Sequence, residues 1–451
     1  MSAKFPEYKG LNLPNVAKEM LEYWAENNIF EKSVTTREGN KPFVFFEGPP
    51  SANGLPGVHH VLARAIKDIF PRYKTMKGFQ VKRKAGWDTH GLPIELGVEK
   101  ELGITKEDIG KTISVEEYNA ACRKAVMRYT DIWNDLTQKM GYWVNMDDPY
   151  VTYEPKYMES VWWLLKQIYE KNLMYKGYTI QPYSPKAGTG LSSHELNQPG
   201  TYQDVTDTTV VAQFKAINET LPNFLQNEGE LYFLAWTTTP WTLPSNTALT
   251  VGPKIEYVLV NTFNQYTFEP TKVVLAKKLV TKQFGGKNNI QVEHLEKLKE
   301  YNPGDKKIPF YIIKEFVGKD LVGIKYEQLL PYVLPNDNPQ DAFRVISGDF
   351  VTTEDGTGIV HTSPTFGADD ALVAKQAKPE IPPMLIKDEN DNLVPLVDLQ
   401  GKFVKELGEF GGKYVKNEYY KDGEAPEKSI DVELAIKLKE ENKAFKVEKY
   451  K

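Results

Sequence analysis

The first part of the chain alternates between helical and extended patterns of hydrophobic residues. Apolar side chains recur three or four positions apart over residues 15–30, which predicts an amphipathic helix. The apolar run "KPFVFFEG" that follows predicts a short buried strand ending at Gly48. From His60 onward, apolar residues again fall on one face of a helix. Strands that alternate with helices in this way are typical of a parallel sheet.

Two further helices are predicted from their boundaries. The sequence "SVEE" at residues 114–117 is a capping box, in which Ser114 and Glu117 satisfy each other's free backbone N–H groups. It predicts a long helix running towards Lys139. The stretch "MESVWWLLKQIYEKNLMYKG" predicts another helix, with Gly177 as its C-cap glycine.

The pattern changes near residues 185–200, which are rich in glycine, serine and proline and predict a loop or hinge. The chain beyond is dominated by β-branched and aromatic stretches such as "DTTVVAQFKAI" and "EYVLVNTF", which predict a second, mostly β domain. After Leu399 the sequence becomes charged and predicts a loop, one amphipathic helix and a final strand. We therefore divide the chain into residues 1–195, 196–398 and 399–451.

Composition narrows the class of protein. With 451 residues, 41% hydrophobic and 26% charged, the chain is expected to form two or three globular domains. It has no apolar run near the roughly 18 residues that span a bilayer, and no apolar block of a signal peptide at its start. We therefore expect a cytoplasmic protein with no membrane partner. The single cysteine, Cys122, excludes an intrachain disulfide and a cysteine-built zinc site, and we expect no protein-bound metal.

The charge of the chain does not by itself indicate a nucleic-acid partner. The formal net charge is −5, although residues 71–88 concentrate six lysines and arginines around two aromatic side chains. Taken alone, such a segment is interpreted more readily as a solvated basic face than as a nucleic-acid contact.

The glycine-rich turn "GPPSANGLPGVHH", which begins at Gly48, contains the first candidate site. A turn of this kind before a helix presents free backbone N–H groups and the positive end of the helix dipole, which suit an anion such as phosphate. A histidine in the first turn can donate a hydrogen bond to it. The turn matches neither the Walker loop nor the dinucleotide fingerprint. Nucleotide binding and a purely structural turn therefore remain equally open on these residues alone.

The second candidate is "GWDTHGLPIE", which contains Trp87, Asp88 and His90. A carboxylate beside an aromatic ring at the end of a strand can receive an ammonium group. The residues alone slightly favour a helix-capping aspartate next to a packed tryptophan.

The third and fourth candidates are "AWTTTPWTLPSN" and "GTGIVHTSPTFGADD". The first places threonine hydroxyls on both faces of an extended segment, although threonine is also common at ordinary strand ends. The second adds His361 and the acidic pair Asp369 and Asp370. A row of hydroxyls with a histidine and a carboxylate suits hydrolysis by an oriented water better than metal chemistry.

Taken together, five motifs in this order resemble the isoleucyl-tRNA synthetase family of class I aminoacyl-tRNA synthetases. They are "EGPPSANGLPGVHH", "KDIFPRYKTMKGF", "AGWDTHGLPIELGVEKELGI", "WTTTPWTLPSNTAL" and "GTGIVHTSP" with "FGADD". The resemblance covers essentially the whole chain. It implies an α/β fold: the first part of a Rossmann-type catalytic domain, interrupted by an inserted, mostly β editing domain.

The resemblance also implies roles in the first domain. Gly48 and Pro49 match the loop that lines the isoleucine pocket, and Asp88 matches the carboxylate that holds the amino acid's ammonium group. The ATP-binding and catalytic positions fall on the glycine-rich turn: Gly54, Gly57, His59 and His60. Gly57 to His60 occupy the HIGH signature, but only His60 stands at a signature histidine. His59 replaces the usual glycine, and its role is open: it substitutes for the histidine missing at Gly57, or it faces solvent.

In the second domain the resemblance implies an editing pocket. Its members match Trp236, Thr237, Thr238, Thr239, Asn246, His361 and Asp370. Asp370 would bind the ammonium group of a mischarged residue, while the threonines and His361 would position the ester and its water. Asp369 is a neighbour without an assigned role.

The implied function is ATP-dependent activation of isoleucine and its transfer to tRNA(Ile), with hydrolysis of mischarged valyl-tRNA. The partners would be tRNA(Ile), isoleucine, valyl-tRNA and ATP as a substrate with Mg²⁺, and we expect a monomer. The sequence ends at Lys451 without a KMSKS loop, so we expect an N-terminal portion that lacks synthetic activity alone. The alternative is a non-catalytic fragment that binds tRNA or a nucleotide.

Overall fold

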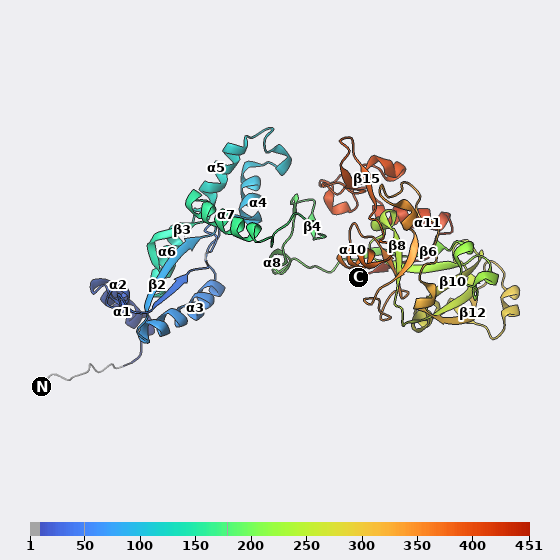
Figure 1. The fold of residues 1–451 in the computed structure, drawn as a ribbon, viewed down its shortest axis with the longest axis horizontal. Coiled ribbons are helices and arrows are strands. Elements are labelled where there is room, and N and C mark those ends of the chain that lie inside the picture. The colour runs from blue at the N-terminus through green and yellow to red at the C-terminus, as the bar shows by residue number, and fades with distance from the viewer. Residues whose placement is uncertain (1–9, 49, 178) are drawn as a thin grey trace. The chain divides into compact units, whose positions relative to one another are not determined.

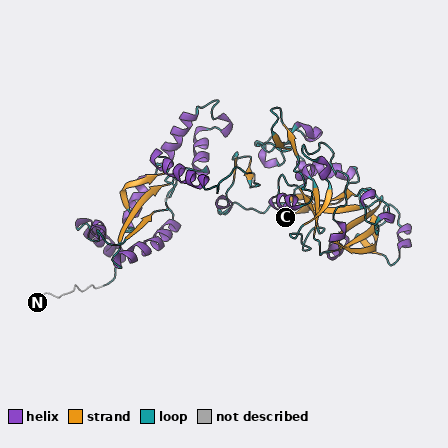
Figure 2. Cartoon of the chain, viewed as in Figure 1, coloured by secondary structure: helices purple, strands orange, loops and turns teal. Residues whose placement is uncertain are grey.

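The computed structural model describes residues 10–48, 50–177 and 179–451. The chain divides into two compact units, Met1–Gly177 and Tyr178–Lys451, which are described separately (Figure 1). The domain boundaries predicted near residues 195 and 398 stay predictions. Helices predominate in the first unit and strands in the second, as Figure 2 shows.

The first unit is built on a three-stranded parallel sheet. Its strands are β1 (Pro42–Phe46), β2 (Gln80–Trp87) and β3 (Asn145–Val151), with β2 in the centre. The predicted parallel sheet is therefore confirmed for this unit. The prediction that β1 is buried is wrong, because β1 is an edge strand and its Val44 and Phe46 side chains are 57% and 60% exposed.

Seven helices of the described first unit accompany this sheet. Their bounds are α1 (Leu13–Glu26), α2 (Ile29–Thr35), α3 (Val58–Met76), α4 (Leu92–Leu102), α5 (Val115–Val126), α6 (Thr130–Lys139) and α7 (Pro155–Glu170). The helix α3 follows β1 through the glycine-rich turn and leads into β2, as the pattern predicts.

The prediction of one long helix running to Lys139 is wrong in one respect, because the chain forms two helices, α5 and α6. The capping box at its start is present: the Ser114 hydroxyl accepts from the Glu117 N–H at 3.2 Å. The break falls where the backbone N–H of Tyr129 donates to the carbonyl of Ala52 at 3.0 Å instead of to its own helix. A contact between segments distant in sequence therefore ends α5.

The helix α7 ends at Glu170, so the prediction that Gly177 caps it is also wrong. Asn172 adopts the left-handed conformation, with φ of 55°. The N–H groups of Leu173 and Asn172 donate to the carbonyls of Ile168 and Tyr169. This is a Schellman ending with asparagine in place of glycine.

The second unit is dominated by a ten-stranded sheet, which confirms the mostly β prediction. Its strands are β6 (Asp207–Lys215), β7 (Tyr232–Thr237), β8 (Ala248–Val251), β9 (Glu256–Phe263), β10 (Pro270–Ala276), β11 (Asn289–Gln291), β12 (Ile308–Val317), β13 (Arg344–Ser347), β14 (Ile359–Thr362) and β17 (Ala444–Tyr450). Smaller elements are β4 (Tyr183–Ser184), β5 (Thr189–Gly190), α8 (Ser193–Leu196), α9 (Val280–Phe284), α10 (Ala368–Gln376), β15 (Leu385–Lys387), β16 (Leu393–Pro395) and α11 (Ile430–Glu440).

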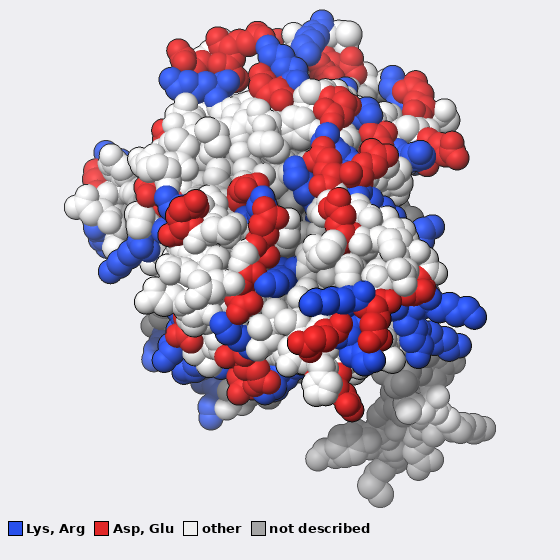
Figure 3. Space-filling view, turned by 90° about the vertical axis from the view of Figure 1, so that its right-hand side faces the viewer, with Lys and Arg blue, Asp and Glu red and all other residues white. Residues whose placement is uncertain are grey.

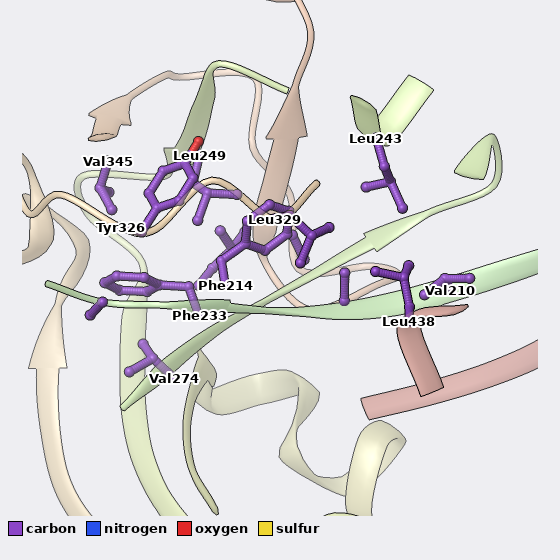
Figure 4. Close-up of a cluster of buried hydrophobic side chains, with 14 of the residues drawn as sticks. Val210, Phe214, Phe233, Leu243, Leu249, Val274, Tyr326, Leu329, Val345 and Leu438 are labelled. Atoms are coloured by element: carbon purple, nitrogen blue, oxygen red, sulfur yellow. The ribbon is translucent and has the colours of Figure 1, made fainter. Parts of the chain in front are cut away.

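The large sheet is buried on both faces. Alternate residues of its strands enter two different apolar clusters, so that Val210 and Phe233 pack in one, and Val211 and Leu234 in the other. Figure 4 shows part of the first cluster, including Phe214, Phe233 and Tyr326. Leu438 of α11 packs there too, and β17 pairs antiparallel with β6. The residues after 399 are thus part of this unit's core.

The surface of the chain carries charges of both signs. On the face drawn in Figure 3, basic and acidic side chains are interspersed between uncharged areas. Within the described ranges, no helix combines the length and apolarity that a membrane crossing requires.

Candidate functional site

A cavity of about 780 Å³ lies in the second unit, where β7 and β14 end. Two smaller cavities in this unit measure about 440 and 320 Å³ and lie away from the predicted site residues. The large cavity is bounded by residues 179–185, the end of β7, the segment from His361 to Asp370 and residues 395–401.

Threonine hydroxyls line one wall of this cavity. Thr237 ends β7, and its hydroxyl accepts from the Thr239 N–H at 3.1 Å. A 3-10 helix, Pro240–Ser245, begins directly afterwards, and residues three apart in such a helix lie on the same side. The Thr242 hydroxyl therefore lies beside Thr239 and donates to its carbonyl at 2.8 Å. Thr238 is exposed and also lines the cavity.

His361 lies on β14 and is 7% exposed. Its Nε2 lies 3.0 Å from the Thr242 hydroxyl and its Nδ1 lies 2.8 Å from the Asn246 side-chain nitrogen. Burial lowers the pKa of His361 to about 4, so the imidazole is neutral at pH 7.

Asp370 lies in the first turn of α10. Its carboxylate accepts from the backbone N–H of Ser363 at 2.8 Å. Burial raises the pKa of Asp370 above its ordinary value, although this hydrogen bond acts in the opposite direction. A Cβ at Gly367 would lie only 2.7 Å from the Asp370 carboxylate, so a glycine is needed there. Within the described part of the chain Asp370 has no salt bridge, and a half-buried carboxylate of this kind suits an ammonium group as its ligand.

The structure brings six of the seven predicted editing residues to this cavity, and Asn246 lies behind it, in contact with His361. Thr242 and Tyr326, which form hydrogen bonds with His361 and Asn246 respectively, are not among the predicted site residues. Thr242 stands in the same threonine-rich motif, three residues after Thr239, so helical spacing was an available signal. The sequence contains no such signal for Tyr326, because Tyr326 lies 80 positions from Asn246.

In the first unit, the glycine-rich turn leads into α3 with Gly57 as the N-cap. The Gly57 N–H donates to Nδ1 of His60 at 2.9 Å. The neutral imidazole of His60 therefore keeps its proton on Nε2 and can donate from there. Burial, followed by the positive charge of His59, lowers the pKa of His60.

The ring of His59 lies against the ring of His60, with centroids 3.8 Å apart, and over Gly57. A Cβ at Gly57 would lie only 2.8 Å from the His59 ring. The His59 ring therefore occupies space that a side chain at position 57 would need. The Gly54 carbonyl accepts from the indole N–H of Trp133 at 2.9 Å, which anchors the turn. Pro49 lies outside the described residues.

Asp88 directly follows β2, and Gly48 follows β1. These strands are parallel neighbours, so both residues lie at the same edge of the sheet. The interpretation of Asp88 as a helix cap is wrong: α4 begins after Gly91, without a side-chain cap, and the Asp88 carboxylate accepts from the His90 N–H at 3.3 Å. Trp87 is packed, as expected, against Ala52 and Trp133.

A parallel α/β unit with this turn, followed by a β unit with a hydroxyl-lined cavity, is the order of domains expected from the resemblance to class I synthetases. The family model "tRNA synthetases class I (I, L, M and V)" matches residues 19–378. The chain belongs to this family, and the α/β fold class predicted from the sequence is confirmed.

Two relatives make the similarity more specific. An isoleucine–tRNA ligase of Bacteroides fragilis is 60% identical over 466 aligned residues, covering 100% of this chain and 40% of the relative. That of Cytophaga hutchinsonii is 61% identical, covering 98% of this chain and 39% of the relative. The predicted resemblance is thus confirmed, and the chain spans about 40% of the length of these relatives.

Among solved structures, the editing domain of the P. falciparum cytosolic leucyl-tRNA synthetase matches 38% of this chain and 66% of its own. The identity is 14% and the TM-score 0.25. Among the described residues, no group of three or more histidine, cysteine or acidic side chains is arranged to hold a metal ion.

Proposed function

We propose that the chain is part of an isoleucine–tRNA ligase and that its second unit hydrolyses mischarged valyl-tRNA. The cavity carries this proposal, because a threonine row, a neutral buried histidine and a half-buried carboxylate converge on it. The relatives named above support the choice of amino acid. The partners we propose are tRNA(Ile), isoleucine, valyl-tRNA and ATP.

The first unit would supply part of the synthetic site. The backbone N–H of Gly54 and the free N–H groups at the N-terminus of α3, which Gly57 caps, would face the phosphates of ATP. His60, with its proton on Nε2, would donate to the phosphate that is attacked by the isoleucine carboxylate. Asp88 would hold the isoleucine ammonium group, and Gly48 would line the pocket for the side chain. His59, which lies over Gly57, would act beside His60.

The second unit would correct the errors that the first site makes. One methylene is worth only about 1–3 kcal/mol in an apolar pocket, and the selection of isoleucine over valine by a synthetase is the standard example of this shortfall. A second pocket that admits valine but excludes isoleucine removes the error. Asp370 would bind the valyl ammonium group, and the threonine hydroxyls with His361 would position the ester and the attacking water.

Replacement of Asp370 tests this assignment. Asp370→Ala in the full 451-residue chain is expected to slow deacylation of valyl-tRNA(Ile) about 10- to 100-fold, because a charge-assisted hydrogen bond to the ammonium group is lost. The matched control is Asp369→Ala, since Asp369 is the exposed neighbour on the same helix turn. It should deacylate at the wild-type rate.

Equal rates for the two variants would contradict the role of Asp370. A wild-type chain that binds valyl-tRNA without hydrolysing it would contradict the hydrolytic function and favour the non-catalytic binding fragment.

A further inference from the structure

A chain of four polar side chains runs from the core of the second unit to its cavity. The Tyr326 hydroxyl donates to the Asn246 side-chain oxygen at 2.6 Å. The Asn246 side-chain nitrogen lies 2.8 Å from Nδ1 of His361, whose Nε2 lies 3.0 Å from the Thr242 hydroxyl. Only the last two of these residues line the cavity.

The orientation of the Asn246 amide is fixed from two sides. Its oxygen accepts from Tyr326, and its nitrogen donates to the Ala248 carbonyl at 2.8 Å. A flipped amide would set its oxygen against the Ala248 carbonyl oxygen and lose that hydrogen bond. Asn246 is 3% exposed, so water cannot replace a lost partner cheaply.

The amide orientation determines the protonation of His361. The second amide hydrogen of Asn246 has Nδ1 as its nearer acceptor, at 2.8 Å against 3.4 Å for the Thr362 carbonyl, so Nδ1 accepts and the imidazole proton is on Nε2. Nε2 then donates to the Thr242 hydroxyl, which donates onward to the Thr239 carbonyl. A proton on Nδ1 would face the amide hydrogens, so both the other tautomer and the imidazolium are disfavoured.

Tyr326 is otherwise surrounded by apolar groups. It is 1% exposed, and its ring packs edge to face on Phe214 and Phe343. In Figure 4 its hydroxyl carries the one oxygen atom visible among the side chains drawn. Phenylalanine would fill the same space without burying a hydroxyl. The Tyr326 hydroxyl therefore affects the site through its hydrogen bond to Asn246.

We infer that Tyr326 is a positioning residue of the hydrolytic site: acting through Asn246, it holds His361 as an Nε2–H donor towards Thr242 and the cavity. His361 then serves as a hydrogen-bond donor and not as a general base, since neither ring nitrogen has a free lone pair. This inference rests on the hydrolytic function proposed above.

Tyr326→Phe in the full chain tests the inference while keeping the ring. The loss of the fixed amide is expected to lower kcat for valyl-tRNA deacylation about tenfold, with KM within about twofold, because the valyl group itself is still bound. The control is Tyr266→Phe. Tyr266 packs against the same core cluster, and its hydroxyl accepts from the distant Val447 N–H at 2.8 Å. It should keep the wild-type kcat.

The tautomer itself gives a readout that a purely structural role would not move. In ¹⁵N NMR of the chain labelled at its six histidines, with His361 assigned by the His361→Gln spectrum, wild type should show Nδ1 unprotonated and Nε2 protonated at pH 7. Tyr326→Phe should show a mixture. Asn246→Asp, whose carboxylate can only accept, should move the imidazole proton of His361 to Nδ1. If Tyr326→Phe does not fold, this variant still tests whether the side chain at position 246, through which Tyr326 acts, sets the tautomer of His361.

A Tyr326→Phe chain with wild-type kcat and an unchanged tautomer would overturn the inference, and so would a wild-type His361 protonated on Nδ1. Absence of deacylation by the wild-type chain would instead refute the proposed function. The NMR spectra would still decide whether Tyr326 sets the tautomer of His361.

Discussion

The first unit leaves the apolar faces of its helices exposed, whereas the second unit covers both faces of its large sheet. Leu62 of α3 and Trp162 of α7 are 63% and 62% exposed, while Leu234 and Leu259 of the second unit are fully buried. The cavity of the second unit therefore rests on a core of its own, while the glycine-rich turn of the first unit adjoins an incompletely covered sheet.

The helix α3 makes the contrast clearest. It buries Arg64 and Thr75 and exposes Leu62 and Ile66. Arg64 is held by the Thr137 hydroxyl at 2.8 Å and lies over the Trp133 ring. The buried side of α3 is thus the more polar one, and its apolar stripe is exposed.

Hydrogen exchange should show the largest difference between the units. Backbone amides of Val258 and Val260 in the central strand β9 are expected to be protected at least about 1,000-fold more than those in the middle of α7, because core strands open only with global unfolding. Mass spectrometry of the intact chain measures both in one sample. Similar protection in β9 and α7 would contradict the difference in stability between the two units.

Matched leucine truncations should differ in their effect on stability. Leu259→Ala is expected to lower the free energy of unfolding of the second unit by about 2–5 kcal/mol, because it leaves a cavity in a buried sheet. Leu62→Ala should change the stability of the first unit by no more than about 0.5 kcal/mol, because the side chain is exposed. Urea titrations followed by circular dichroism check both. A larger loss for Leu62→Ala would mean that α3 packs in solution.

The stability of the second unit should depend on pH through His361. Its pKa of about 4 in the folded chain lies below the ordinary 6.5, so between these values the unfolded chain binds a proton that the folded chain does not. Stability should therefore fall as the pH falls through this window, by about 2 kcal/mol between pH 7 and pH 5. Urea midpoints of wild type and His361→Gln at both pH values measure it. The same loss in both chains would contradict a neutral buried His361.

Local patterns predicted most of the elements. The periodicity of α3, the capping box at Ser114 and the β-branched strands of the second unit depend on neighbouring residues, and all three are present. The features that escaped prediction depend on distant contacts. The backbone N–H of Tyr129 donates to the Ala52 carbonyl and not within its own helix. Which face of α3 is exposed depends on the elements that pack against this helix.

The same distinction holds for the cavity. The motifs pointed to Thr237 and Asp370, because hydroxyls and a carboxylate are visible in the sequence. They could not reveal that Asn246 stands behind His361 or that Tyr326 bonds Asn246 across 80 positions. Burial of Asp370, which raises its pKa, is likewise a property of packing.

The most direct test of the account is the selectivity of the full chain between two substrates. Initial deacylation rates are compared for valyl-tRNA(Ile) and isoleucyl-tRNA(Ile) at equal concentration. We predict that the valyl ester is hydrolysed at least about tenfold faster, the discrimination expected when one extra methylene must be excluded from a pocket. Equal rates, or faster hydrolysis of the isoleucyl ester, would contradict the claim that the cavity of the second unit is an editing site.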